Sequence, residues 1–200
     1  MEKQLIISIG REFGSGGHEI AEMLAEHFSI KLYDKSLLQD IAQEKQIDGK
    51  ELERYDEKPR NKFLTRSLYG YSQSMEENLA NMQFEFIKKR AEKGESFVVV
   101  GRCAETILKN QPALVSIFVL GDWESKIDRV VRLYHLTREE AESFINRQDS
   151  KRKHYHNYYC KGKWGDSRNY DIAVNSSKLG EKLTADLLAE YILQRQQHFS

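Results

Sequence analysis

Short apolar runs alternate with longer amphipathic stretches along the chain. Continuous apolar runs at 97–100 and 114–120 are typical of central strands in a parallel sheet, where both faces of each strand are covered. Shorter apolar runs predict three more strands, at 5–9, 30–33 and 170–174. Apolar residues at helical spacing predict four helices, over residues 20–28, 35–46, 72–93 and 179–194.

Capping signals mark where two further helices begin. Asp48 with Glu51, and Thr137 with Glu140, have the spacing of a capping box, in which each side chain bonds the backbone amide of the other residue. The first pair predicts a helix that begins near residue 49. The second pair predicts a helix that becomes strongly basic from Arg147 onward.

Strands that alternate with helices favour a single α/β domain. The expected fold is a three-layer structure over residues 1–200, with a mainly parallel five-stranded sheet and a ligand at the carboxyl ends of its strands. A chain of this length can bury one substantial core. The closing helix is expected to face the sheet with five apolar side chains: Leu183, Leu187, Leu188, Tyr191 and Ile192.

The charge balance, apolar segment lengths and cysteine count disfavour some classes of protein function for this chain. The 31 basic and 31 acidic residues cancel, so no overall field attracts nucleic acid or an anionic membrane. The apolar segments are too short for a membrane span or a signal peptide, and we expect a cytoplasmic protein. Cys103 and Cys160 are too few for a disulfide framework, so both are expected to be reduced thiols. Homo-oligomerisation stays open.

The most specific motif follows the first strand and opens the first helix, where residues 10–18 read Gly-Arg-Glu-Phe-Gly-Ser-Gly-Gly-His. Glycines let backbone amides point into one concavity, and the helix N-terminus adds partial positive charge, so the loop can hold a phosphate. In the usual phosphate loop, the last glycine is followed by Lys and then by Ser or Thr. Gly16 matches that glycine, but Gly17 replaces the lysine and His18 the hydroxyl, which makes Arg11 the candidate substitute cation. A tight strand-to-helix turn without a ligand is the alternative.

This loop, with Ile20 and Ala21 behind it, resembles that of the cytidylate kinase-like family, which is related to the nucleoside monophosphate kinases. The similarity runs nearly end to end. It implies the phosphate-loop fold and ATP as the phosphoryl donor. It assigns donor binding to the loop and to one residue after the last strand: Gly10, Arg11, Phe13, Gly14, Ser15, Gly16, Gly17, His18 and Asn175.

Two positions resemble the acceptor site of true cytidylate kinases. Asp34 follows the second strand, where those enzymes begin a helical acceptor-binding region, here placed at residues 34–95. Val100-Gly101-Arg102-Cys103 is similar to their Asp-Gly-Arg-Asp stretch, whose arginine grips the acceptor phosphate, and this implies that role for Arg102. Without the two aspartates, Mg²⁺ would depend on phosphates, water, and Glu12 or Asp34. A helix cap at Asp34 and an ion pair at Arg102 are the alternatives.

A basic segment resembles the arginine-rich lid of nucleoside monophosphate kinases, here placed at residues 146–168. A lid excludes water and brings cations to the transferring phosphoryl group. The resemblance assigns this catalytic role to Arg147, Lys151 and Arg152, together with Arg11 in the loop. A solvated helix face is the alternative for each lid residue.

Histidine and cysteine also gather near the end of this segment. His154, His156 and Cys160 are metal-ligand types, but their spacing matches no standard zinc pattern, and no metal site is expected. The aromatic residues around them indicate helix packing, or stacking on a base, for Tyr155, Tyr158, Tyr159 and Trp164.

The expected function is that of a nucleotide-binding small-molecule kinase. It would transfer a phosphoryl group from ATP to a nucleoside monophosphate such as CMP, or to a related acceptor. Two alternatives remain: a nucleotide- or anion-binding module that has lost transfer, which the missing lysine favours, and a kinase of a different phosphorylated metabolite. Nucleic-acid binding is disfavoured, because the basic stretch is local.

Overall fold

The computed structural model describes residues 3–34, 36–45 and 75–198. The helix expected near residue 49 lies outside these residues. Within this part of the chain, no helix is both long enough and apolar enough to cross a membrane.

Five strands form one sheet: β1 (Ile6–Arg11), β2 (Lys31–Tyr33), β3 (Phe97–Val100), β4 (Leu114–Leu120) and β5 (Ile172–Asn175). Their order is β2-β3-β1-β4-β5, and every neighbouring pair is parallel. The predicted parallel sheet is therefore confirmed. All four side chains of β3 are buried, as its unbroken apolar run predicts for a strand covered on both faces.

Seven α-helices and two short 3₁₀ segments are described: α1 (Gly17–His27), α2 (Leu37–Lys45), α4 (Met75–Glu92), α5 (Ala104–Ile107), α6 (Trp123–Tyr134), α7 (Arg138–Tyr159), α8 (Gly180–His198), η1 (Ser167–Asn169) and η2 (Ser176–Lys178). The apolar pattern predicts α1, α2, α4 and α8, and the Thr137 capping box predicts α7, whereas α5 and α6 were not predicted. α5 is a single turn. α6 buries only Ile127 and Val130 among its apolar residues, so its helical spacing is sparse amid charged residues.

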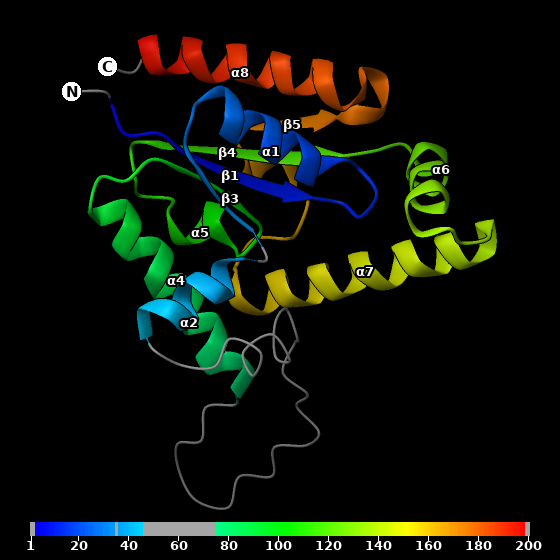
Figure 1. The fold of residues 1–200 in the computed structure, drawn as a ribbon, viewed down its shortest axis with the longest axis horizontal. Helices are drawn as coiled ribbons and strands as arrows, with labels where there is room; N and C mark the ends of the chain where they lie inside the picture. Colours follow the sequence, from blue (N-terminus) through cyan, green and yellow to red (C-terminus); the bar gives the residue numbers. More distant parts are fainter. Residues whose placement is uncertain (1–2, 35, 46–74, 199–200) are drawn as a thin grey trace, which may run out of the picture.

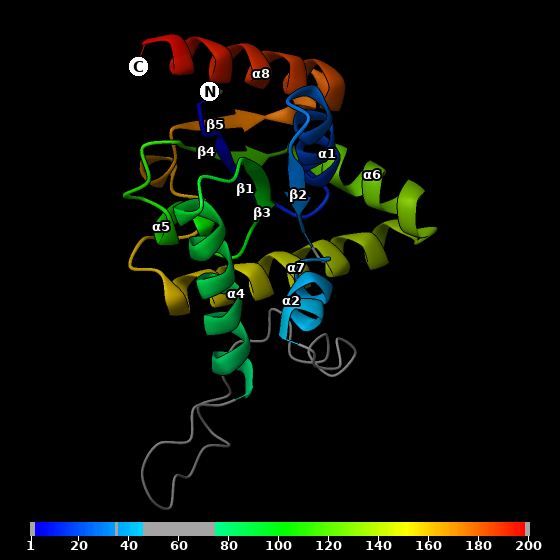
Figure 2. The same cartoon turned by 60° about the vertical axis from the view of Figure 1, so that its left-hand side comes forward.

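Helices cover both faces of the sheet, which gives the predicted three layers (Figure 1). α1 and α8 pack on one face through a core that contains Leu24 and Leu188. α2, α4 and α5 lie on the other face, around Leu37, Ile87 and Ala104. Figure 2 shows the same separation from another side, with α8 above the strands and α2 and α4 below.

α8 meets the sheet with a different face from the one predicted. Its buried residues are Thr184, Ala185, Leu188, Ala189 and Ile192. Leu183 and Leu187 are 56% and 48% exposed, so their assignment to the sheet side was wrong. The small residues Ala185 and Ala189 form the stripe that packs inward, and the two leucines lie outside it.

α7 is the long helix that the Thr137 cap predicts. The Thr137 side chain accepts from the Glu140 amide, and the Glu140 carboxylate accepts from the Thr137 amide at 2.8 Å, so the capping box is confirmed. Along its length α7 passes the loop after β1, where Phe144 packs against Phe13. Its far end belongs to the same small core as Cys103, which follows β3.

Candidate functional site

The loop between β1 and α1 turns at two glycines. Gly14 and Gly16 have φ values of +80° and +74°, a conformation that side-chain-bearing residues rarely adopt. A Cβ at Gly16 would also lie 2.6 Å from Cγ of Glu181. Gly16 and Gly17 both line a cavity at the start of α1, where unpaired helix amides and the helix dipole favour an anion. The geometry therefore fits a phosphate.

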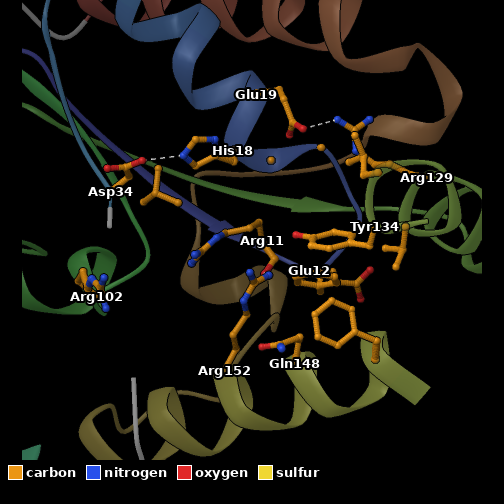
Figure 3. A pocket seen from close by; sticks show the side chains of 18 of the residues that line it. Arg11, Glu12, His18, Glu19, Asp34, Arg102, Arg129, Tyr134, Gln148 and Arg152 are labelled. Atoms are coloured by element: carbon orange, nitrogen blue, oxygen red, sulfur yellow. Dashed lines mark hydrogen bonds and ion pairs between the residues drawn. The ribbon is translucent and has the colours of Figure 1, made fainter. Parts of the chain in front are cut away.

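The cavity has a volume of about 880 Å³, which suits a nucleotide-sized ligand, and it opens where β1 and β3 end. The loop forms one wall, and Asp34 and Arg102 lie on the opposite side. In Figure 3, Arg11 extends across the cavity toward Arg102, and Arg152 reaches up from α7 toward Arg11. Three predicted cationic residues thus line one space.

Compared with the usual phosphate loop, a glycine and a cationic residue have changed places in this loop. In the usual pattern, the first glycine stands five positions before the last glycine, and lysine follows the last. Here Arg11 stands five positions before Gly16, and Gly17 takes the lysine position. The two exchanged positions are in contact, because a Cβ at Gly17 would lie 2.6 Å from Cβ of Arg11. The Arg11 guanidinium continues to Gly101, where it occupies the space of a side chain.

A partly buried ion network ties the loop to α7. The Phe13 amide donates to Asp149 Oδ1 at 2.6 Å, and Lys126 Nζ donates to Asp149 at 3.1 Å and to Glu12 at 3.0 Å. Only 6% of the Lys126 side chain is exposed. Burial raises the pKa of the Asp149 carboxyl, although the Phe13 amide and Lys126 oppose the shift. Asp149 therefore satisfies one backbone amide of the loop and links the loop to α7.

The predicted lid cations separate into two groups. Arg152 lines the cavity, and its guanidinium donates to the Arg11 carbonyl at 3.3 Å and lies 5.2 Å from the Phe13 ring centroid. Arg147 and Lys151 are exposed and do not line this cavity. Arg147 instead lies over the Phe144 ring at 5.2 Å. Only Arg152 is brought to the site by the described fold.

Arg102 lies in a strained turn between β3 and α5. Gly101, Arg102 and Cys103 have successive φ values of +75°, +61° and +55°. A left-handed backbone costs a residue with a side chain roughly 1–2 kcal/mol, and such strain concentrates at functional sites. Arg102 is 3% exposed, and it lines the cavity opposite the loop. This position agrees with the acceptor role that the resemblance implies.

His18 and Asp34 form a pair at the edge of the cavity, with Nε2 of His18 2.7 Å from Oδ2 of Asp34 (Figure 3). Asp34 Oδ1 also accepts from the Ser36 amide at 2.8 Å, which is the capping contact considered as an alternative. Burial raises the pKa of Asp34, but hydrogen bonds from His18 and Ser36 bring it below its ordinary value. Asp34 thus combines a structural contact with a place on the cavity wall.

Arg129 of α6 is a candidate cation that the sequence pattern does not single out. Its guanidinium pairs with Glu19 of α1 at 2.6 Å and with Glu181 of α8, and only 12% of its side chain is exposed. It lines the main cavity and a second one of about 430 Å³ that Ser176 and Ser177 also line. The helical spacing of Ile127 and Val130 in α6 is the sequence signal that could have drawn attention to Arg129.

Four predicted donor residues make structural contacts, and Phe13 also lines the main cavity. Phe13 packs against Phe144, and Ser15 is buried, with its hydroxyl donating to the Glu12 carbonyl at 2.9 Å. Gly10 is not part of the main cavity wall, and a Cβ there would lie 2.8 Å from the Phe118 ring.

The fourth is Asn175, which ends β5. Its amide donates to Asp122 at 2.7 Å and accepts from the Ser177 amide at 3.0 Å. Asn175 thus holds the turn whose next two residues, Ser176 and Ser177, face the 430 Å³ cavity. The sequence-predicted position lies one residue away from those that line it.

Comparisons with known proteins agree with this geometry. The model of the cytidylate kinase-like family matches residues 6–178. A crystal structure of an uncharacterized protein from Eubacterium ventriosum is 40% identical, with a TM-score of 0.75 over 94% of this chain and 98% of that chain. Shikimate kinases from Bacteroides thetaiotaomicron and Aquifex aeolicus share the fold at 12% and 13% identity. Their TM-scores are 0.55 and 0.51, over 94% and 97% of this chain and 98% and 99% of theirs. A search of curated proteins found no match. The chain belongs to the cytidylate kinase-like family, as its glycine-rich loop and Arg102 stretch predict.

Proposed function

We propose that this protein is a kinase that transfers a phosphoryl group from ATP to a nucleoside monophosphate such as CMP, or to a related phosphorylated acceptor. One observation carries the proposal: a single cavity has the glycine-rich loop on one side and Arg102 on the other, with Arg11 and Arg152 between them. Phosphoryl transfer depends mainly on positioning two phosphorylated ligands and on cations that stabilise the transferring charge. Membership of the family supports the same reaction class.

Each residue has a role in this proposal. The amides at Gly16 and Gly17 would bind donor phosphates, because they stand at the start of α1. Arg102 would hold the acceptor phosphate through its planar guanidinium, which suits bidentate contacts. Arg11 and Arg152 would stabilise charge between the two ligands, since they line the space between the loop and Arg102.

Magnesium would neutralise phosphate charge if ATP binds as its Mg²⁺ complex. The cavity wall includes three carboxylates, those of Glu12, Glu19 and Asp34. Glu12 is held by Lys126 and Glu19 by Arg129, so Asp34, beside His18, is the best-placed protein ligand. The residues fit the phosphates more closely than the metal. We therefore expect phosphates and water to supply most of the Mg²⁺ ligands.

A nucleotide- or anion-binding module without transfer is the second candidate function. Gly17 at the lysine position is the observation that favours it, because the usual loop lysine contacts the transferring phosphates. Under this proposal, Arg11 and Arg152 would bind the ligand without supporting turnover. Binding and turnover assays therefore have to be read together.

The first experiment is thermal unfolding against nucleoside mono-, di- and triphosphates, with and without Mg²⁺, because a ligand that prefers the folded state raises the midpoint. Each pair that shifts the midpoint is then assayed for ADP release. Binding with turnover supports the kinase, and binding without turnover under every condition supports the binding module. No shift with any nucleotide would reject both. The acceptor panel should include phosphorylated metabolites without a base, which tests the third alternative.

Arg11→Ala tests the exchanged cation directly. We expect weaker triphosphate binding and slower ADP release with an unchanged unfolding midpoint in the absence of ligand, because the Arg11 guanidinium lies in the cavity. Lys151→Ala is the matched control, since Lys151 is exposed and lies outside the cavity wall. Equal triphosphate affinity in the Arg11 variant and the wild type would reject the compensating role.

A further inference from the structure

A second cluster of reactive side chains lies behind Arg102, separate from the proposed transfer chemistry. Glu105 of α5 and His156 of α7 are paired at 2.8 Å, and Cys160 follows the end of α7. One ligand atom from each of these three residues lies within 4.8 Å of the other two. Cys103 is not one of these three residues, but it hydrogen-bonds Cys160, which places a second sulfur beside the group. Both cysteines are free and buried.

We propose that Cys103, Glu105, His156 and Cys160 form a zinc-binding site. Two sulfurs, one imidazole nitrogen and one carboxylate oxygen are the donor types that a tetrahedral Zn²⁺ site uses. With bonds of about 2.0–2.3 Å, the ligand atoms of such a site lie roughly 3–4 Å apart. The observed limit of 4.8 Å therefore requires only small side-chain movements for the Glu105, His156 and Cys160 atoms to converge, whereas Cys103, which is not in that group, would turn toward them from beside Cys160. The site would not depend on the proposed kinase function.

Burial separates this group from an ordinary surface cluster. The side chains of Glu105 and His156 are 3% and 7% exposed, and Cys103 and Cys160 are 3% and 7% exposed as residues. Buried carboxylates and thiolates are costly unless they are paired or bind a metal. The neighbouring cavity, of about 30 Å³, has room for one water or one ion, and Cys103, Glu105 and His156 line it.

Two further contacts resemble the outer shell of a metal site. Thr106 Oγ1 donates to Glu105 Oε1 at 3.1 Å, which orients the carboxylate. Asn157 Oδ1 lies 3.3 Å from Nδ1 of His156, so Nδ1 can donate there and leave Nε2 as the metal-binding nitrogen. Such partners fix the orientation of metal-ligating side chains.

The metal-free state has its own charge balance. Burial lowers the pKa of His156, but hydrogen bonds to Cys160 and Glu105 raise it well above its ordinary value. The hydrogen bond from Cys103, followed by that from His156, lowers the pKa of the Cys160 thiol despite burial. Zn²⁺ binding would release into solvent the protons that the thiols and the imidazole nitrogen carry in the metal-free protein.

The place of the cluster in the fold gives the site a role. Cys103 and Glu105 follow Arg102 directly, whereas His156 and Cys160 belong to the far end of α7, which carries Arg152 one turn earlier. A metal would therefore hold the strained Arg102 turn against the helix that carries Arg152. Arg102 and Arg152 also line the 30 Å³ cavity. The competing explanation is that these two arginines neutralise the negative charge of the cluster without a metal ion.

The test uses the full chain, treated with a chelator and then titrated with Zn²⁺ or Co²⁺ in the absence of nucleotide. We expect one Zn²⁺ per chain, a visible Co²⁺ spectrum of tetrahedral type, and a near-ultraviolet band from thiolate ligation. Failure to bind Zn²⁺, or a Co²⁺ spectrum without a thiolate band, would overturn the proposal and leave an ion-pair cluster. These readouts need no variant.

Variants then identify the ligands. Cys160→Ser should weaken Zn²⁺ binding by more than about 100-fold, and Thr106→Val by about 10-fold, as expected for loss of an orienting partner. His154→Gln is the matched control, because His154 is exposed on the same helix and contacts the Ser150 carbonyl rather than the cluster. Equal weakening by Cys160→Ser and His154→Gln, or none by either, would overturn the assignment of these ligands.

Discussion

The two strand-to-helix turns at the edge of the sheet differ in how they present positive charge. After β1, Gly14 and Gly16 adopt the left-handed conformation and line the cavity. After β3, Arg102 and Cys103 adopt the same conformation with side chains attached, at a cost of roughly 1–2 kcal/mol each. In the proposed function, the first turn would offer backbone amides to a phosphate, and the second would offer one guanidinium.

The surroundings of the two turns differ accordingly. The network of Glu12, Lys126 and Asp149 holds the backbone of the loop, because Asp149 accepts from the Phe13 amide. The Arg102 turn is followed by the cluster of Glu105 and its partners on α7. α7 contacts both turns, so substitutions at different positions along this helix can disturb one turn and leave the other intact.

The largest expected effect is on the loop. Asp149→Ala should lower the free energy of unfolding by about 3 kcal/mol, because removal of one partner leaves the buried Lys126 and the Phe13 amide poorly compensated. Chemical denaturation measures this directly. Lys151→Ala, an exposed change two residues away on α7, should stay within about 0.5 kcal/mol. Equal losses in the two variants would show that the network does not hold the loop.

Arg102→Met should affect the other turn. We expect kcat/KM for the acceptor to fall by about 30-fold, equivalent to about 2 kcal/mol for a charge-assisted contact, with little change in the KM for ATP. Steady-state ADP release with each substrate varied in turn measures the separation. Arg147→Met, on the exposed part of α7, should leave both values unchanged. A matching fall in ATP affinity would assign Arg102 to the donor instead.

Gly17→Lys restores the lysine of the usual phosphate loop. The variant should lower the free energy of unfolding by about 1.5 kcal/mol, because the new Cβ would overlap the Arg11 side chain. The double variant Arg11→Gly with Gly17→Lys should recover much of that loss, and thermal and chemical unfolding compare the three proteins. Recovery would show that the two positions are coupled. Additive losses would contradict the exchange of glycine and cation along the loop.

The smallest effect concerns Asp34, whose lowered pKa means that its ionised form stabilises the folded protein. This stabilisation is present above the unfolded-state pKa of about 3.9 and is lost as the pH falls through the lower folded-state value. Asp34→Asn keeps a capping residue but loses the charge beside His18, so it should cost less than about 1 kcal/mol at pH 7. The cost should shrink as the pH falls below about 4. A constant cost from pH 7 to pH 3 would reject this pairing.

Several parts of the site were predictable from local patterns. The glycines after β1 have to take conformations that other residues avoid, so Gly14 and Gly16 identify the loop without tertiary information. The Thr137 capping box is equally local. The α6 residues Lys126 and Arg129 were missed, because only two apolar positions of that helix are buried and charged residues surround them. Their roles depend on partners more than 20 residues away.

The sequence by itself determined the five strands, most of the helices, the parallel sheet and the glycine-rich loop, because apolar periodicity, glycine and caps act over a few residues. Only the tertiary structure decided which side chains share a space. It brought Arg152 to the cavity and left Lys151 outside, although they are adjacent in the chain. It also placed Glu105 beside His156, 51 residues away, because parallel strands end at one edge of the sheet and α7 packs across that edge. Contacts of that range depend on packing between layers, which local sequence does not encode.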